Sequence, residues 1–555
     1  MTFELFRKQV EKVVGGYAKL LKAPPKDIAD LALPCFTIED KPEGLSKQFI
    51  EEIRKNKKKF SLIGEVKSVG PFVNFHINYH EFSKIIMKDV IKLGSKYGSK
   101  RKGKNRILVE YSAPNSNKPL HIGHLRNDSI GMSISRILDF TGNTVVKANL
   151  VNDRGIHICK SMLAYQKWGE GTDPKKAGKK GDHLVGDFYV MFEQESKKDE
   201  KIKEESKEML NKWEKGDKAT IALWKKMNKW AIDGMKETYK NFGSEFDDWF
   251  FESEIYKKAK PIIEEGWKKG VFKKDTAGAV LAKLEKWGLP DKYIVRSDGT
   301  STYLTQDMPL TVEKFEKHKV NESIWVVASE QIIYLKQLFK IMNLLGYDYK
   351  LTHLSYGLVH LRSGRMKSRE GRVIDADDLM HDILGLARKA IKQRYKDLDK
   401  KETELRAREI MLAAIKYYYL KVEPVRDLMF EPEKAISFEG NTGPYLLYTY
   451  ARARSILRKS EKKEKITSLQ DEKEFMIIKK LSMFPLILKD AAKQLKPNYV
   501  ANYLHELALL FNEYYHDEKI IGSDNEESKL AFVKATAIVL KNGLKMLGIN
   551  TIEKM

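Results

Sequence analysis

The sequence has very little cysteine: Cys35 and Cys159 stand far apart in a chain of 555 residues. It contains no Cys-x-x-Cys pair and no Cys/His cluster, which disfavours a structural zinc site. Unpaired thiols suit a reducing compartment. We therefore expect no zinc, no dedicated metal site of any kind, and a cytoplasmic location.

Long apolar runs and a targeting segment are also missing. No stretch of about 18 uncharged apolar residues occurs, so we expect no membrane span and no membrane partner. The first residues, MTFE, lack the basic start and the continuous apolar core of a signal peptide. A soluble cytoplasmic protein is expected, and a mitochondrial or plastid form made without a transit peptide stays open.

Acidic residues are outnumbered, because 77 Asp and Glu stand against 101 Lys and Arg, which gives a formal net charge of +24. Such a balance favours polyanionic partners such as nucleic acid. The lysines are scattered along the chain, so a lysine-rich genome explains the charge equally well. The length predicts roughly three or four domains.

One stretch, residues 107–126 (ILVEYSAPNSNKPLHIGHLR), carries the strongest functional signal. It begins with a short apolar run typical of a buried strand, continues in a polar turn, and opens a helix at His121. A strand followed by a helix N-terminus favours anions, because free N–H groups and the helix dipole attract negative charge. His121 and His124 share a helical face, and Gly123 lets a ligand approach the backbone. Two histidines in isolation would more often be packing or surface residues.

This stretch resembles the HIGH signature of class I aminoacyl-tRNA synthetases. The longer run from Glu110 through Lys118 to His124 is similar to the version in arginyl-tRNA synthetases, and it is far more specific than the four-letter core. The resemblance covers nearly the whole chain in the family's order. It implies an N-terminal additional tRNA-binding domain (1–104), a catalytic domain (105–430) and an anticodon-binding domain (431–555).

The patterns of the three segments predict a multidomain protein. Residues 1–104 read as helices followed by strands over 60–69 and 71–77, which predicts a small α+β domain. Residues 105–430 alternate strands and helices, which predicts an α/β Rossmann-like domain with a parallel sheet. A charged, mostly helical insertion is expected at about 167–260. Residues 431–555 keep helical periodicity, which predicts an all-α helical bundle.

The resemblance implies a two-step reaction. L-Arginine and ATP would give arginyl-adenylate and diphosphate, and the arginyl group would pass to the 3′ end of tRNA(Arg). ATP would be a substrate carried with Mg²⁺. Activation is expected to depend on tRNA, and the chain is expected to be a monomer. Because the first step is attack on phosphorus, positioning and charge stabilisation dominate.

Recognition of arginine requires acceptors for a planar guanidinium that is always charged, and carboxylates fill that role with paired hydrogen bonds. The resemblance assigns Glu110 and Asp307 to the guanidinium, and Tyr303 lies four residues before Asp307, on the same helical face. Taken singly, each residue could be an ordinary polar group at a strand end. The arginine contacts implied are Glu110, Ala113, Pro114, Asn115, His124, Tyr303, Asp307 and Gln331.

ATP would lie over the HIGH turn, and a basic loop at 363–371 would close over the diphosphate. If Met366 is aligned with the methionine of the family's KMSKS loop, its second lysine is Ser368, so one charge is missing. Members without that lysine carry one before the HIGH motif, where Lys118 stands; a solvated Lys118 is the alternative. The ATP contacts implied are Lys118, His121, Gly123, His124, Met366 and Lys367, and the catalytic residues are Lys118, His121, His124, Lys367 and Arg369.

The resemblance also assigns tRNA contacts. Phe72 and Asn74 would stack on and hydrogen-bond to an unpaired base, although core packing is the structural alternative for Phe72. Tyr448, Arg452 and Met555 match positions that touch the anticodon loop, where aromatic stacking and Arg–phosphate contacts are the physical basis. Tyr448 could equally be a helix-packing residue.

Two other functions are compatible with parts of the sequence. A metabolite adenylyltransferase of the HIGH group would not need residues 430–555, and other class I synthetases would not need two carboxylates aimed at a cation. A non-catalytic RNA-binding paralogue would be expected to lose His121, His124 or the arginine pocket.

Overall fold

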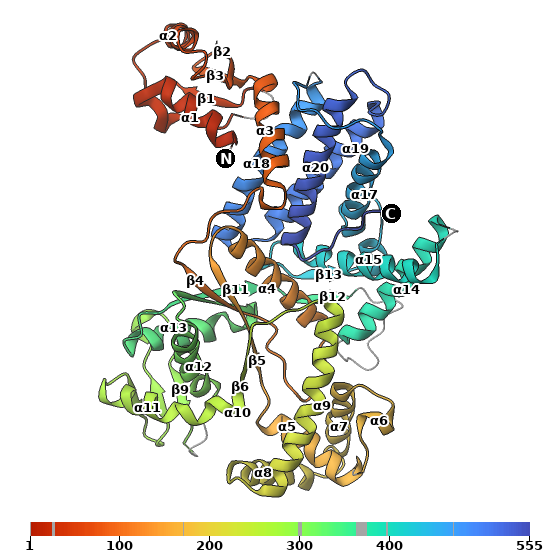
Figure 1. Cartoon of the computed structure of the whole chain (residues 1–555). Coiled ribbons are helices and arrows are strands. Elements are labelled where there is room, and N and C mark those ends of the chain that lie inside the picture. The colour runs from red at the N-terminus through yellow and green to blue at the C-terminus, as the bar shows by residue number, and fades with distance from the viewer. Residues whose placement is uncertain are drawn as a thin grey trace. The chain divides into compact units, whose positions relative to one another are not determined.

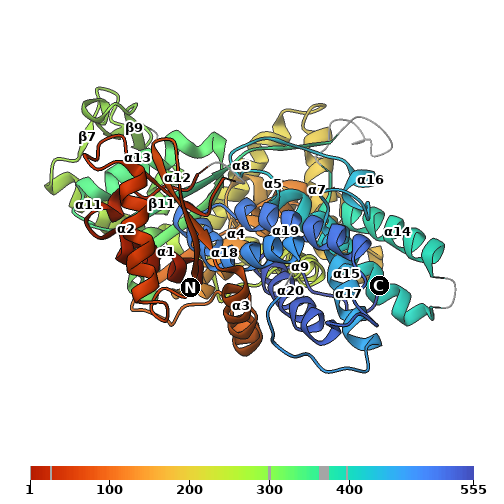
Figure 2. The ribbon, with the colours of Figure 1, turned by 90° about the horizontal axis from the view of Figure 1, so that it is seen from above.

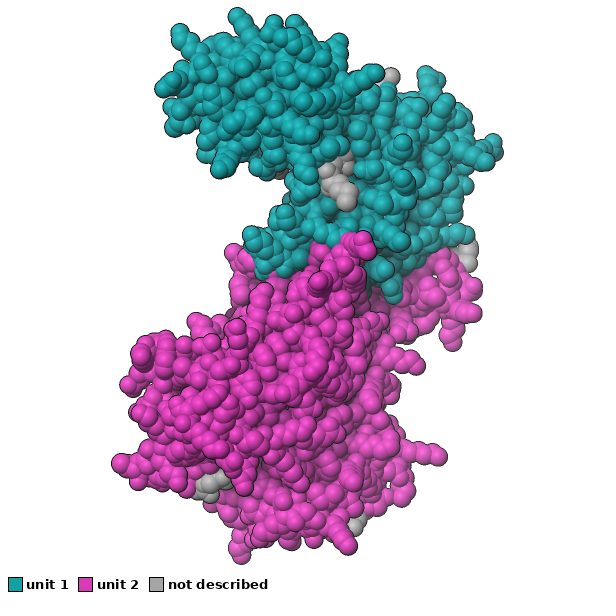
Figure 3. Space-filling model, turned by 60° about the vertical axis from the view of Figure 1, so that its left-hand side comes forward, with its two compact units in different colours: residues 1–100, 438–494, 499–555 teal, residues 101–437, 495–498 magenta. Residues whose placement is uncertain are grey.

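The computed structural model describes residues 2–24, 28–169, 171–297, 302–361, 374–395, 398–469 and 471–555. The chain forms two compact units, which Figure 3 shows in different colours. Unit 1 contains Met1–Lys100, Phe438–Gln494 and Tyr499–Met555, and unit 2 contains Arg101–Ser437 and Leu495–Asn498.

Unit 2 is built on a five-stranded sheet in the order β11-β10-β4-β5-β6. Every neighbouring pair is parallel, which confirms the predicted α/β fold. The strands are β4 (Arg106–Glu110), β5 (Thr144–Val151), β6 (Asp248–Phe251), β10 (Glu322–Ala328) and β11 (Lys350–Tyr356).

Helices cover both faces of this sheet, as a parallel sheet requires. Helix α4 (Ile122–Phe140) packs on β4, β5 and β10. Helices α12 (Tyr303–His318) and α13 (Ile332–Leu344) lie on the other side (Figure 1). Leu108 of β4 and Phe250 of β6 share a buried cluster with Leu310 and Phe315 of α12, so the apolar runs of the strands are buried by the helices.

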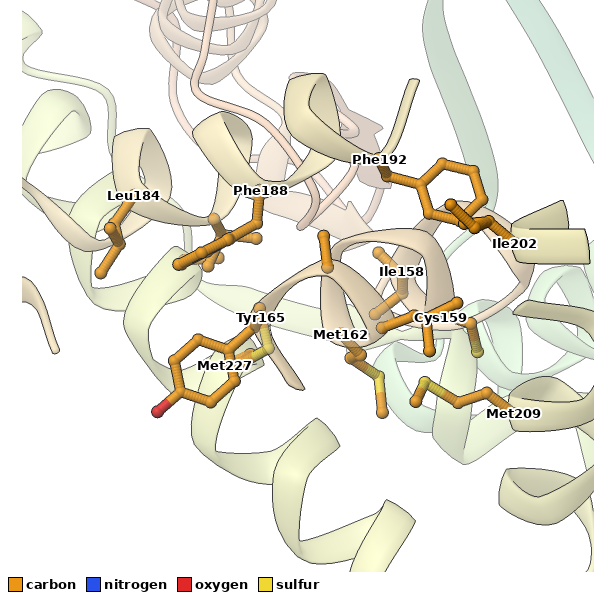
Figure 4. Packing of buried hydrophobic residues seen from close by; sticks show 14 residues of the cluster. Ile158, Cys159, Met162, Tyr165, Leu184, Phe188, Phe192, Ile202, Met209 and Met227 are labelled. Atoms are coloured by element: carbon orange, nitrogen blue, oxygen red, sulfur yellow. The ribbon is translucent and has the colours of Figure 1, made fainter. Parts of the chain in front are cut away.

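The helical insertion has its own core. It contains α5 (Ile156–Ala164), α6 (Pro174–Ala177), α7 (Gly181–Glu195), α8 (Lys201–Glu214) and α9 (Lys218–Phe242). Side chains from α5, α7, α8 and α9 interlock in this core, among them Met162, Phe188, Met209 and Met227 (Figure 4). Strand β6, which was predicted to lie inside the insertion, is instead the edge strand of the central sheet.

The remainder of unit 2 completes the domain. A small antiparallel sheet, β7 (Phe272–Lys274), β8 (Val280–Ala282) and β9 (Lys292–Val295), has strands too short to show in the sequence pattern. Strand β12 (Val359–Leu361) pairs with β13 (Leu428–Phe430). The remaining helices are α10 (Glu252–Ile255), α11 (Ala259–Lys268), α14 (Ala376–Arg394), α15 (Lys400–Leu420) and α16 (Pro432–Ala435).

Unit 1 combines an antiparallel sheet and a helical bundle. The sheet has the order β1-β3-β2, from β1 (Leu31–Pro34), β2 (Ile63–Val69) and β3 (Phe72–Ile77). Its helices are α1 (Thr2–Val14), α2 (Pro42–Lys55) and α3 (Tyr79–Leu93), and the bundle contains α17 (Gly443–Lys459), α18 (Glu472–Gln494), α19 (Asn498–Asp517) and α20 (Glu526–Met546). Helix α20 packs against α3, α17 and α18 (Figures 1 and 2). The all-α character predicted for the C-terminal part is confirmed.

Helix length and polarity also bear on the membrane question. Across the described parts of the chain, no helix is long and apolar enough to cross a bilayer.

Candidate active site

The strand order of the central sheet creates a switch point between β4 and β10. The chain runs from β4 to β5 in one direction and from β10 to β11 in the other, and ligands of such sheets bind beyond the carboxyl ends of the strands at this point. Glu110, the last residue of β4, is paired in register with Trp325 of β10. The topology of the sheet therefore predicts a functional site at the carboxyl end of β4, beside Glu110.

A cavity of about 820 Å³ lies at this position. Six of the eight predicted arginine contacts line it together: Glu110, Ala113, Asn115, Tyr303, Asp307 and Gln331. Of the other two, Pro114 is buried in the adjoining turn, and His124 lies on the first turn of α4. The structure thus brings Glu110 and Asp307 to one pocket, although they are far apart in sequence.

Two acidic side chains in the pocket sit in an environment that disfavours their charge. Burial raises the pKa of Asp307 to about 6, and Glu110 adds to the rise, whereas the hydroxyl of Tyr334, which donates to Asp307, and Lys314 oppose it. Burial also raises the pKa of Glu252 to about 7; the guanidinium of Arg154 opposes this rise, and Asp307 adds to it. A bound cation would relieve both effects.

Glu252 and Tyr334 were not identified from the sequence. Glu252 directly follows β6 and is 8% exposed, so it occupies a strand end like that of Glu110. An acidic residue after the apolar run at 249–251 was the available signal. It was missed because this run was assigned to the helical insertion.

Glu110 has an unexpected partner. The ammonium of Lys314, on α12, lies 2.6 Å from Glu110 Oε2, and the two side chains are 0% and 4% exposed. A buried carboxylate needs such compensation. Glu110 therefore faces the pocket with part of its charge already neutralised.

The HIGH motif forms the N-terminus of α4. His121 is the N-cap residue, and the amide of Gly123 donates to its Nδ1 at 3.1 Å. The amide of His121 donates to Nδ1 of His124 at 3.1 Å. Because a backbone N–H can only donate, Nδ1 of each ring is unprotonated. Each neutral imidazole must then carry its proton on Nε2.

Both imidazoles are held in the neutral form. Burial lowers the pKa of His121 to about 4, and Lys118 adds to this effect. Burial, His121 and Lys118 place the pKa of His124 well below its usual range. The two rings lie with centroids 3.9 Å apart. The motif thus presents two neutral Nε2–H donors side by side.

The amides of Ile122 and Gly123 at this helix end are not free, contrary to the expectation from the sequence. The amide of Ile122 donates to the carbonyl of Ile374 at 3.1 Å, and the amide of Gly123 is bound by His121. Attraction of an anion here depends on the helix dipole and on the histidine donors instead.

Of the cations predicted to act on the phosphates, Lys118 lies within the described residues. Lys118 is partly buried, and burial lowers its pKa. Met366, Lys367 and Arg369 lie outside the described residues. The chain directly after them, at 374–376, forms backbone hydrogen bonds with Leu120 and Ile122, which joins it to the HIGH turn.

A cluster of possible metal ligands lies elsewhere in unit 2. Ligand atoms of Asp182, His183 and Asp377 gather within 4.8 Å. The ammonium of Lys180 is bound to Asp377 and lies 3.3 Å from Asp182. A side-chain cation therefore already balances this cluster, and we assign no metal to it.

The predicted RNA contacts in the small sheet of unit 1 differ in exposure. Phe72 is partly exposed and contacts the ring of Phe36 edge-on, at 5.2 Å between centroids. Phe36, which was not predicted, is 69% exposed. Asn74 is 3% exposed in the middle strand β3, so the prediction that its side chain touches RNA is not supported by its position.

In the helical bundle of unit 1, the predicted residues Tyr448 and Arg452 form a partly exposed stack with Tyr515, which was not predicted. The guanidinium of Arg452 lies 4.7 Å from the ring centroid of Tyr448 and 4.8 Å from that of Tyr515. Met555 is partly buried, and the nearby Glu553 is held by Arg454 and Tyr450 of α17. Stacked rings with an Arg between them are typical of a site for unpaired bases.

A parallel sheet with a polar pocket at its switch point, next to a helix that begins with the HIGH motif, defines the catalytic domain of a class I aminoacyl-tRNA synthetase. The family described as "tRNA synthetases class I (R), catalytic domain" matches residues 86–431. The family described as "DALR anticodon binding domain" matches residues 446–555. The chain belongs to the class I tRNA synthetases of the R type.

Curated relatives and solved structures agree with this assignment. The arginine–tRNA ligase of Treponema denticola is 40% identical over 570 residues, covering 98% of this chain and 96% of that protein. That of Borrelia turicatae is 42% identical over 557 residues, covering 97% and 94%. The arginyl-tRNA synthetase structure of Thermus thermophilus has a TM-score of 0.83 at 24% identity, covering 99% of this chain and all of that one. At that identity the likeness shows a shared fold.

Proposed function

We propose that this chain activates L-arginine with ATP, forming arginyl-adenylate and diphosphate, and then transfers the arginyl group to the 3′ end of tRNA(Arg). The observation that carries the proposal is the pocket in which Asp307 and Glu252 lie beside the end of β4. Within the described residues, neither carboxylate forms an ion pair with a basic side chain. A guanidinium is the cation whose shape matches two such acceptors.

The arginine site has three parts in this proposal. Asp307 and Glu252 accept hydrogen bonds from the guanidinium, and Glu110, paired with Lys314, closes the same wall. Tyr303 and Gln331 contact the substrate from the rim, where both are exposed. The amino and carboxylate ends lie against Ala113, Pro114, Asn115 and His124.

The phosphates of ATP lie over the HIGH turn. The Nε2–H groups of His121 and His124 donate to phosphate oxygens as charge builds up during displacement, and Gly123 allows close approach. Lys118 supplies the fixed cation. Met366, Lys367 and Arg369 are proposed to close over the diphosphate. Mg²⁺ enters as part of the ATP substrate, since the acidic cluster at Asp377 is already balanced by a lysine.

The tRNA is proposed to be held at two places in unit 1. Phe72, with its neighbour Phe36, offers an aromatic platform for an unpaired base. Tyr448, Arg452 and Met555 are proposed to contact the anticodon loop. The stack of Arg452 with Tyr448 and Tyr515 supports this role for Tyr448 and Arg452.

We propose that the chain is organised as an N-terminal tRNA-binding domain (1–104), a catalytic domain (105–430) and an anticodon-binding domain (431–555). We further propose a monomeric cytoplasmic enzyme without zinc, in which adenylate formation requires bound tRNA.

An aminoacylation assay that offers each of the twenty amino acids with total tRNA tests the function. Arginine should be attached to RNA, and the other nineteen should give background levels. ATP–diphosphate exchange with arginine should appear when tRNA is added. Charging of a different amino acid would overturn the proposed function, and robust exchange without RNA would remove its tRNA requirement.

A further inference from the structure

The turn after β4 has a strained backbone. Ser112 has φ +77° and Ala113 has φ +49°, and they are two of the four residues other than glycine with positive φ in the described parts of the chain. Residues with a Cβ rarely adopt this backbone conformation, because the Cβ then crowds the following carbonyl oxygen. Two such residues in succession persist only where their surroundings enforce it.

Three buried side chains enforce it. The amide of Ser112 donates to Oδ1 of Asn127 at 2.7 Å, and the amide of Ala113 donates to Oδ1 of Asn149 at 3.1 Å. The hydroxyl of Tyr239 lies 2.6 Å from Oγ of Ser112 and accepts from Nδ2 of Asn149 at 3.3 Å. Asn127, Asn149 and Tyr239 are 4%, 0% and 3% exposed.

These three side chains come from different elements, and each is itself fixed. Asn127, on α4, donates to the carbonyl of Val326 at 2.8 Å and to the hydroxyl of Tyr356 at 3.0 Å. Asn149 belongs to β5, and Tyr239 belongs to α9 of the helical insertion. The turn is thus held from the sheet, from the HIGH helix and from the insertion.

The held turn forms one wall of the arginine pocket. After Ala113, the carbonyl of Pro114 accepts from the amide of Asn152 at 2.9 Å, and the amide of Ser116 donates to the carbonyl of Asn152 at 3.0 Å. Asn115, between these two fixed residues, and Ala113, just before them, line the cavity. A relaxation of φ at Ser112 or Ala113 would move both lining residues.

We infer that Asn127, Asn149 and Tyr239 are positioning residues that hold Ser112 and Ala113 in the left-handed conformation and so keep Ala113 and Asn115 in place for arginine. They act through the turn and do not touch the substrate. The inference rests on the proposed function, and it gives the insertion helix α9 a direct part in shaping the amino-acid site.

Tyr239→Phe separates this role from packing. The ring of Tyr239 contacts Phe246 and Trp249, with centroids 5.0 and 5.8 Å away, and these contacts remain when the hydroxyl is removed. Tyr418→Phe is the control, because the hydroxyl of Tyr418 also donates a hydrogen bond inside unit 2, to the carbonyl of Met429 at 3.1 Å, and Tyr418 does not line the pocket.

The test compares the full-length Asn149→Ala, Tyr239→Phe and Tyr418→Phe proteins in tRNA charging, together with their melting temperatures. The KM for arginine should rise about fivefold or more in Asn149→Ala and about threefold in Tyr239→Phe, the scale of one lost hydrogen bond. The KM for ATP should change less than about twofold. Tyr418→Phe should lower the melting temperature and leave the KM for arginine unchanged.

A rescue experiment tests the strain itself. Glycine adopts positive φ without steric cost. Adding Ala113→Gly to Asn149→Ala should therefore lower the raised KM for arginine again, by about threefold. No recovery, or an unchanged KM in Asn149→Ala and Tyr239→Phe despite lower melting temperatures, would overturn the inference. Failure of the unmodified chain to charge tRNA with arginine would instead contradict the proposed function.

Discussion

Lys314 Nζ lies 2.6 Å from Glu110 Oε2, and both side chains are almost completely excluded from solvent. The same ammonium lies 3.7 Å from the ring centroid of Trp325, which is a favourable cation–π distance. A cation thus lies against two residues that line a pocket, Glu110 and Trp325, although the proposed ligand of the pocket is itself a cation. Asp307 and Glu252 remain as the acids available to a guanidinium.

Loss of this lysine should be costly. Lys314→Met leaves the Glu110 carboxylate buried without its partner, so we expect the free energy of unfolding to fall by about 3–5 kcal/mol. Adding Glu110→Gln should recover much of the loss, because the unpaired charge is then gone. Denaturant unfolding measures both. Lys258→Met, which breaks the solvent-exposed pair with Glu313, is the control and should cost less than about 1 kcal/mol; equal losses in the two single variants would contradict the argument.

The two available acids should control arginine affinity. Asp307→Ala removes a charge-assisted acceptor worth about 1.5–3 kcal/mol, so the KM for arginine should rise by about tenfold or more, and Glu252→Gln should act in the same direction. The KM for ATP should stay nearly constant. Glu313→Gln, on the same helix but paired with the exposed Lys258, serves as the control. Unchanged arginine kinetics in Asp307→Ala would rule out its assignment.

Arginine use should depend on pH through the same groups. The pKa values of Asp307 and Glu252 are raised to about 6 and about 7, and only the ionised carboxylates attract a guanidinium. The kcat/KM for arginine should therefore be constant above about pH 8, fall by about tenfold per pH unit between about pH 7 and pH 6, and approach a fall of about 100-fold per pH unit well below pH 6, where both carboxylates are protonated. Glu252→Gln removes the upper of the two groups, so the fall should begin at a lower pH. A profile for arginine that matches the profile for ATP, or that does not move in Glu252→Gln, would show that other groups are responsible.

Much of the catalytic fold was predictable because its strands are short apolar runs followed by polar sequence motifs. The run at 107–109 and the HIGH turn fix β4 and the start of α4 in this way. The strand at 248–251 was missed because it follows about eighty helical, lysine-rich residues and is only four residues long. Its assignment to the insertion also concealed Glu252, since a residue at a strand end can be recognised only when the strand is recognised.

Other features of the site depend on tertiary contacts that leave no local pattern. Lys314 occupies a position in α12 that looks like one more exposed lysine, and its burial against Glu110 follows from packing across the sheet. The left-handed backbone of Ser112 and Ala113 is equally hidden, because neither residue type is typical of positive φ. Burial is hidden in the same way at Asn74, a polar residue that is 3% exposed in the small sheet.

The two histidines of the HIGH motif should differ from ordinary acid–base groups in their response to mutation. His121 caps α4 through Nδ1 and presents Nε2–H. Asparagine is a good N-cap but has no donor at the ε position, whereas glutamine has that donor and caps less well. His121→Asn should therefore lower the rate of adenylate formation by about 100-fold and keep the melting temperature, and His121→Gln should be about tenfold faster than His121→Asn but less stable. The same order for rate and for stability would contradict this division of roles.

Lys118 should matter more to adenylate formation than the lysine of the basic loop. If Met366 is aligned with the methionine of the family's loop, Ser368 takes the place of its second lysine, and a positive charge is then needed from another part of the chain. Lys118 is partly buried next to His121 and His124. A cation that already lies beside the HIGH turn needs little reorganisation as charge develops. Lys118→Ala should therefore slow single-turnover adenylate formation, measured with tRNA present, more than Lys367→Ala does. Lys118→Arg should restore part of the rate, and Lys229→Ala, which removes a lysine 74% exposed on α9, should have no effect. A larger loss in Lys367→Ala than in Lys118→Ala would place the essential cation in the loop instead.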